Sequence, residues 1–318
     1  MSSKINPFTN VIQNCMAVKP TDSVLIVTDP TRNLLACEFL KAAKEITKKA
    51  ELISFDSMIE NAQEPPKEIG DLLHTSDVCL LITTYSLSHT QARKNACKAG
   101  ARIASMPGIT KDMILRTLSE DYSEIAKTSQ KLKKVLETGK KVTITSPGGT
   151  NLTLTITNRP VIADTGFFTK PGDFGNLPAG ETFLAPIEEK TNGTIIFDGS
   201  FAGITLDKPI KIEVKNGLAI KISGGKAAKT LKKLIDRVRP CHKAKIIGEL
   251  GLGTNKTCKL CPQILEAEKV YGTAHLALGN NFGFGGSNQV SFHSDGIILN
   301  PTVTVDKKII IKNNKILI

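Results

Sequence analysis

The sequence contains no tryptophan, and aromatic residues make up only 5% of its 318 residues. It also has no uninterrupted apolar run of about 18–20 residues, which excludes a membrane-spanning helix. No charged stub followed by an apolar run occurs near the start, so we expect no signal peptide. Seven cysteines, an odd number in a long chain, argue against a disulfide scaffold. We therefore expect a cytoplasmic protein, and its 40% hydrophobic residues exclude a disordered chain.

The charge of the chain is unbalanced, because 42 Lys and Arg residues against 30 Asp and Glu give a formal net charge of +12. Nucleic-acid-binding proteins concentrate basic residues on one face and often add aromatic platforms. Here the lysines are scattered in short pairs such as Lys48-Lys49 and Lys133-Lys134, with few aromatic residues beside them. We interpret them as a solvated surface and expect neither a nucleic-acid nor a membrane partner.

The N-terminal part alternates short apolar runs with helical patterns. Residues 33–49 and 90–99 have apolar residues at helical spacing, and residues 110–137 form the longest such pattern. This order predicts a mainly parallel sheet covered by helices. No G-x-G-x-x-G turn follows the first run, so a dinucleotide site is not expected. The apolar runs lie at residues 23–28, 51–55, 78–83 and 101–105.

The character of the sequence changes near residue 140. Residues 141–146 and 152–156 alternate in polarity around the turn Pro147-Gly148-Gly149, which predicts a β-hairpin. We therefore expect an α/β domain at residues 1–140, followed by a β-rich α+β domain at residues 141–318 that carries the metal site. Further β-like runs lie at residues 193–197, 210–214, 218–222, 303–305 and 308–311, and one helix lies near 227–238.

The residues that could perform chemistry lie in the second half. His293 and Asp295 are two apart, so on a strand both point to one side and can reach one divalent cation. His275 and Glu249 lie in apolar, glycine-rich segments, where a polar group needs a partner or a metal. Glu181 follows a turn-rich stretch. Two histidines and three carboxylates match the ligands of a two-metal hydrolase.

Four motifs, at residues 175–181, 248–251, 272–279 and 293–295, resemble in order and spacing those of the metal-dependent aminopeptidase T / aminopeptidase S group. Residues 146–152 are similar too. The resemblance covers residues 140–306 well and the N-terminal half only by pattern.

The resemblance implies a metalloaminopeptidase that removes N-terminal residues from short peptides and forms a homodimer. It implies two divalent ions, Zn, Co or Mn, with Glu249 bridging them and an activated water as the nucleophile. The five implied metal ligands are Glu181, Glu249, His275, His293 and Asp295.

The sequence departs from this family at Phe282, where the peptidases carry a tyrosine that stabilises the tetrahedral intermediate. Loss of one such donor costs on the order of 10²–10³ in rate. Tyr271 or Asn281 could replace it, and in a peptidase Phe282→Tyr would raise kcat.

A ring-cleaving dihydroxypyridine dioxygenase of the same fold resembles these peptidases but holds one Fe(II). His275, His293 and Asp295 would supply its facial triad. Glu181 and Glu249 would then be outer-shell or substrate-contacting groups, and their presence favours the two-metal interpretation. A non-catalytic relative that binds ligands in a degenerate pocket is the third alternative.

Cys258 and Cys261 form a C-x-x-C pair that could bind structural zinc together with Cys241 and His242. Since Cys241 and His242 are adjacent, both side chains cannot easily reach one ion. We interpret these cysteines as reduced thiols.

Overall fold

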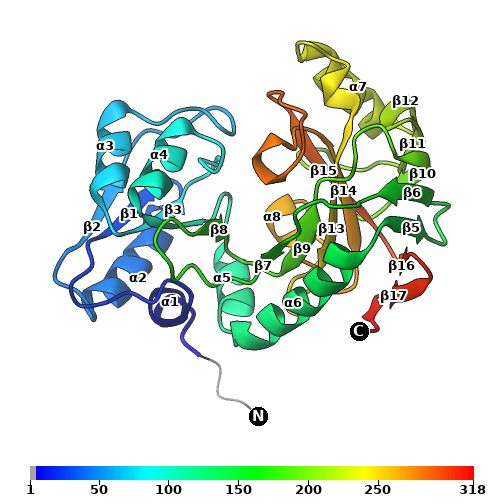
Figure 1. Cartoon of the computed structure of the whole chain (residues 1–318). Coiled ribbons are helices and arrows are strands. Elements are labelled where there is room, and N and C mark those ends of the chain that lie inside the picture. Colours follow the sequence, from blue (N-terminus) through cyan, green and yellow to red (C-terminus); the bar gives the residue numbers. More distant parts are fainter. Residues whose placement is uncertain (1–4) are drawn as a thin grey trace. The chain divides into compact units, whose positions relative to one another are not determined.

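The computed structural model describes residues 5–318, which divide into two compact units (Figure 1). Unit 1 contains the chain up to Ser123 together with Gly166–Ala179, and unit 2 contains Glu124–Thr165 and Gly180–Ile318. This division differs in two ways from the boundary expected near residue 140. Most of the helix before that point belongs to unit 2, and a later segment returns to unit 1.

Unit 1 is built on a five-stranded sheet in the order β2-β1-β3-β4-β8, and all of its strand pairs are parallel. Its central strands β1 and β3 are apolar and buried along their whole length, as expected for strands covered on both faces. The predicted mainly parallel sheet is therefore confirmed. The strands are β1 (Val24–Thr28), β2 (Ala50–Ser54), β3 (Val78–Ile82), β4 (Arg102–Ser105) and β8 (Phe174–Asn176).

The helices of unit 1 precede or follow these strands. α4 ends at Ala99, and the next residue, Gly100, has the left-handed φ of +108° that commonly ends a helix. The helices are α1 (Pro7–Asn10), η1 (Val11–Cys15), α2 (Asn33–Lys44), α3 (Lys67–Thr75), α4 (Gln91–Ala99) and α5 (Lys111–Thr117).

The long helix predicted over residues 110–137 is two helices, α5 and α6 (Tyr122–Thr138). The helical pattern is interrupted before α6, where the Asp121 side chain accepts a hydrogen bond from the Ser123 backbone N–H at 2.8 Å. Short polar side chains of this kind satisfy the exposed N–H groups at a helix start, so they begin a new helix. In unit 2, Leu132 and Leu136 of α6 join the apolar core.

Unit 2 contains two largely antiparallel sheets. The eight-stranded sheet has the order β12-β11-β10-β6-β5-β16-β17-β18, and the five-stranded sheet has the order β15-β14-β13-β9-β7. The predicted hairpin is confirmed as β5 and β6, which pair from Lys141 opposite Thr155 to Thr145 opposite Asn151. The eight-stranded sheet comprises β5 (Lys141–Thr145), β6 (Asn151–Thr155), β10 (Asn192–Phe197), β11 (Ile210–Lys215), β12 (Leu218–Ser223), β16 (Thr302–Val305), β17 (Lys308–Lys312) and β18 (Lys315–Ile316).

The five-stranded sheet packs against the eight-stranded sheet through one apolar core, to which Ile144 and Leu152 contribute from one side and Leu250 and Leu276 from the other. Its strands are β7 (Ile162–Asp164), β9 (Glu181–Leu184), β13 (Ile247–Gly253), β14 (Ala274–Gly279) and β15 (His293–Ile298). The remaining helices of unit 2 are α7 (Lys226–Arg237), η2 (Lys243–Lys245), α8 (Ile264–Ala267) and η3 (Phe282–Phe284).

Over residues 5–318, no helix combines the length and the apolar character that a membrane crossing requires. All seven cysteines lie within these residues, outside any disulfide.

Candidate metal centre

The five-stranded sheet of unit 2, β15-β14-β13-β9-β7, has one apolar face and one polar face. Side chains alternate between the faces of a strand, and one set belongs to the apolar core of unit 2. The opposite face carries polar and very small side chains. The core-facing set includes Leu250, Leu252, Leu276, Leu278 and Ile298.

Strand register aligns the polar set on the opposite face. Asp295 lies opposite Ala277, which in turn lies opposite Glu249, so these residues form one row across β15, β14 and β13. His275 lies opposite Gly251 in the next row. Antiparallel partners share a face, so the register brings residues from three strands to one place.

Gly251 provides the space for the His275 ring. A Cβ atom at position 251 would lie 2.0 Å from His275 Nε2, much closer than two such atoms can approach. Gly251, the last residue of the motif at residues 248–251, is therefore required by the imidazole on the neighbouring strand.

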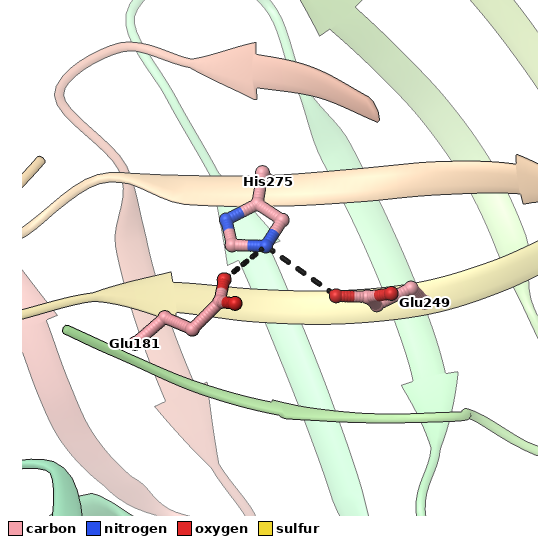
Figure 2. A group of neighbouring side chains, drawn as sticks. All are labelled: Glu181, Glu249 and His275. Atoms are coloured by element: carbon pink, nitrogen blue, oxygen red, sulfur yellow. Dashed lines mark ion pairs between the residues drawn. The ribbon is translucent and has the colours of Figure 1, made fainter. Parts of the chain in front are cut away.

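The structure brings all five predicted ligand residues together. His275 Nε2 lies 3.0 Å from Glu181 Oε2 and 3.5 Å from Glu249 Oε1. Figure 2 marks both ion pairs with dashed lines. His293 Nε2 lies 3.3 Å from Glu249 Oε2 and 3.5 Å from Asp295 Oδ2. Glu249 therefore contacts both histidines, one with each carboxylate oxygen.

Three overlapping groups have ligand atoms that all lie within 4.8 Å of one another. Glu249 is shared by two of them, and Asp295 is shared by two. Within residues 5–318, none of these groups contains a cysteine, so the geometry gives no support to structural zinc at Cys258 and Cys261. The groups are Glu181/Glu249/His275, Glu249/His293/Asp295 and Glu268/His275/Asp295.

Some buried atoms of this cluster lack a full set of hydrogen bonds. Among the described residues, His275 Nδ1 has no hydrogen-bond partner, and His275 Nε2 and Glu181 Oε2 have only their ion-pair contacts within the cluster. Native proteins rarely leave buried polar atoms short of partners. Converging imidazole nitrogens and carboxylate oxygens are ligands for divalent transition metals, including iron. The residues present thus fit a metal ion.

The electrostatics of the cluster are those of closely spaced opposite charges. Burial by itself lowers the pKa of His275, but Glu181 and Glu249 outweigh it and raise that pKa to about 10. Asp295 and Glu249 likewise raise the pKa of His293 well above its ordinary value, against the effect of burial. Burial raises the pKa of Glu249, but its histidine contacts produce a net lowering. In the metal-free protein, the histidines therefore act as the cations of the site, and a metal must displace their protons.

Sequence reasoning missed Glu268 and Lys269, which follow α8. The Lys269 side chain is only 1% exposed, and its Nζ lies 2.5 Å from Glu181 Oε1, 2.7 Å from Glu268 Oε1 and 3.8 Å from Asp164 Oδ2. Burial is the largest influence on Glu268 and raises its pKa to about 8. The available signal was their position: a Glu-Lys pair directly before the apolar segment at residues 270–279.

His293 is positioned by the loop that precedes its strand. Its Nδ1 lies 2.8 Å from the Asn280 carbonyl oxygen, and the Phe284 ring meets it edge-on at 6.1 Å between centroids. Asn281 donates a hydrogen bond to Glu188 at 3.1 Å. Phe282, at the position where the peptidases carry a tyrosine, is 59% exposed.

A family model described as 2,5-dihydroxypyridine 5,6-dioxygenase matches residues 3–318. The 2,5-dihydroxypyridine 5,6-dioxygenase of Pseudomonas putida is 21% identical over 92% of this chain and 90% of its own length. A solved structure of the 2,5-dihydroxypyridine dioxygenase from Pseudomonas putida KT2440 has a TM-score of 0.84 and 18% identity, covering 98% of this chain and 96% of that one. Wild-type AmpT from Thermus thermophilus has a TM-score of 0.71 and 15% identity, with 98% of both chains covered.

The prediction of a metalloaminopeptidase that hydrolyses short peptides is wrong, and so is the assignment to the hydrolases and proteases. Both the family model and the curated relative carry a dioxygenase description. The likeness to AmpT shows a shared fold, and a shared fold does not fix the reaction. The dioxygenase alternative is the better supported of the two enzyme interpretations.

Proposed function

The chain belongs to the 2,5-dihydroxypyridine 5,6-dioxygenase family, and we propose that it is a metal-dependent dioxygenase that opens a dihydroxylated pyridine ring. Such a reaction adds both atoms of one O₂ molecule to the substrate as a bond of the ring breaks, with no other oxidant. The observation that carries the proposal is the family match over residues 3–318, and the buried imidazole and carboxylate cluster in unit 2 supports it.

We propose that His275, His293 and Asp295 hold a single ferrous ion. Asp295 supports this choice because its ligand atoms lie within 4.8 Å of those of His293 in one group and of those of His275 in another. Two histidines and one carboxylate, with other positions open, form the usual ligand set of non-haem Fe(II) oxygenases. A bound ferrous ion would supply the redox chemistry that lets O₂ react with an aromatic ring.

Glu181 and Glu249 are then substrate-contacting or ligand-orienting groups. Burial raises the pKa of Glu181, but Lys269 and His275 together lower it below the ordinary value, so this carboxylate stays ionised at neutral pH. Its Oε2 can accept a hydrogen bond from a hydroxyl group of the ring. Glu249 contacts both histidines and fixes the direction of their Nε2 atoms.

The accessibility of the cluster differs among its members. The His293 side chain is 23% exposed, whereas that of His275 is 1% exposed. Solvent therefore reaches the cluster at His293, and the His275 side excludes water. We expect substrate to approach from the His293 side.

The test is oxygen uptake by the protein after anaerobic loading with Fe(II), using 2,5-dihydroxypyridine and its dihydroxylated isomers. We expect one O₂ consumed for each ring opened, followed as loss of the ring's ultraviolet absorption. Asp295→Ala should reduce the rate by more than the roughly 10–100-fold typical of outer-shell changes, because it removes a ligand.

Ser294→Ala is the matched control. Ser294 is buried on the same strand, and its strand partner is the core residue Leu278, so its side chain lies on the face away from the cluster. We expect this variant to retain the activity of the original protein. Absence of oxygen uptake with every dihydroxylated pyridine, in iron-loaded protein, would contradict the proposed function.

A further inference from the structure

Lys269 is a buried ammonium group surrounded by carboxylates. Its Nζ lies within 4 Å of oxygen atoms of Glu181, Glu268 and Asp164. An ammonium group offers three N–H donors, and a buried charge is tolerated only when it is paired. The three acidic neighbours therefore pair the charge of Lys269 inside the protein.

Two of these neighbours also belong to the groups that have metal-binding geometry. Glu181 forms one group with Glu249 and His275, and Glu268 forms another with His275 and Asp295. One oxygen of each of these two carboxylates is directed to Lys269 Nζ. The ammonium group thus supplies positive charge to the part of the cluster that a second metal ion would otherwise neutralise.

We propose that Lys269 is a built-in cation that limits this centre to one metal ion. The inference rests on the proposed function, in which that ion is held by His275, His293 and Asp295. A second divalent ion held by Glu181 and Glu249 would lie beside the fixed charge of Lys269, because Lys269 Nζ is 2.5 Å from Glu181 Oε1, and like charges repel strongly where water is excluded. With Lys269 in place, a sheet face that has enough carboxylates for two ions can serve a reaction that uses one ion.

The test is a titration of the metal-free full-length protein with Mn(II), chosen because it does not oxidise readily and has a clear electron paramagnetic resonance spectrum. We expect one tightly bound ion per chain, with the six-line spectrum of an isolated Mn(II). In Lys269→Met, which keeps the length of the side chain and removes the charge, we expect two ions per chain. Their spectrum should show exchange coupling between neighbouring ions.

Three further variants keep the inference testable. Adding Glu181→Gln to Lys269→Met should return the count to one ion, because a ligand of the second position is lost. Lys256→Met should remain at one ion, since Lys256 is exposed and lies over the Tyr271 ring. If Lys269→Met alone does not fold, as judged by circular dichroism, Lys269→Met with Glu268→Gln removes one buried carboxylate together with the ammonium. That variant should still bind a second ion through Glu181 and Glu249.

The possible outcomes separate this inference from the proposed function. Two ions in the original protein, or a single ion in folded Lys269→Met or in folded Lys269→Met with Glu268→Gln, would overturn the role of Lys269 and leave the proposed ring-opening reaction intact. No bound ion in the original protein would overturn both. One ion in the original protein and two in the variant would support the inference.

Discussion

At the scale of single residues, the metal centre depends on the space that Gly251 leaves. Gly251→Ala would place a methyl group 2.0 Å from the present position of His275 Nε2, so the ring must move away from Glu181 and Glu249. We expect metal affinity to fall by about 10–100-fold, the effect typical of disturbing the groups that orient a ligand. Isothermal titration calorimetry with Mn(II) measures this change.

Gly283→Ala is the matched control for that substitution, because a Cβ atom at Gly283 would meet no atom within 4 Å. We expect its metal affinity to be unchanged. Equal affinities in Gly251→Ala and the original protein would show that His275 does not bind the ion from its observed position.

The residues of the centre were predictable only in part. Glu181, Glu249, His275, His293 and Asp295 were found because each stands beside a glycine-rich or turn-rich motif or in an alternating pattern, and the structure places them together. Their role as ligands stays a prediction. Lys269 could not be recognised, because its partners Glu181 and Asp164 are 88 and 105 positions away and meet it only through the pairing of β7, β9 and β13.

At the scale of secondary structure, Asp29 joins the ends of β1 and β3 in unit 1. Its carboxylate accepts hydrogen bonds from Thr31 N at 3.0 Å and from Thr84 N at 2.5 Å. Burial raises the pKa of Asp29, but these bonds outweigh it and lower the pKa below 3.8. The stabilisation is therefore fully present above pH 3.8 and is lost as the pH falls through the lower pKa of the folded state.

Asp29→Asn should thus reduce the free energy of unfolding at pH 7 by about 1–2 kcal/mol, since hydrogen bonds to a charged group are lost. The difference from the original protein should shrink as the pH is lowered below about 4. Urea unfolding followed by circular dichroism, at pH 7 and at pH 3, measures both values. Asp56→Asn, an exposed position in the same unit, is the control. A difference that does not change with pH would contradict this role of the Asp29 charge.

Local patterns predicted most strands and helices but not their complete connections. The parallel sheet of unit 1 and the β5–β6 hairpin followed from apolar runs and a Pro-Gly-Gly turn. β8 was not predicted, because Phe174-Gly175-Asn176 has no apolar run and the segment resembles a turn. Its place beside β4 depends on contacts between positions about 70 residues apart, which no local pattern records.

At the scale of the whole molecule, the fold and the ligand-type residues did not determine the reaction. The motifs on this fold favoured a peptidase, whereas the family model and the curated relative carry a dioxygenase description, so the motifs alone led to the wrong class. Lys269 adds a fixed positive charge that no count of histidines and carboxylates includes.

The distribution of these residues between the units predicts how metal binding affects the molecule. The three proposed ligands, together with Glu181, Glu249 and Lys269, all lie in unit 2. A ligand stabilises the structure that it binds and slows the local opening of that structure. We expect Mn(II) to slow amide hydrogen exchange in β13, β14 and β15 by at least about 10-fold, which corresponds to about 1.4 kcal/mol of local stabilisation.

In β1 and β3 of unit 1, we expect exchange rates to change little, because their buried strands carry none of these residues. Hydrogen–deuterium exchange followed by mass spectrometry, with and without Mn(II), measures both units in one sample. Asp295→Ala is the control and should lose the protection in unit 2. Equal slowing in the strands of both units would mean that the ion stabilises the chain as a single cooperative body. Slowing in unit 1 alone would place the bound ion outside the five-stranded sheet of unit 2.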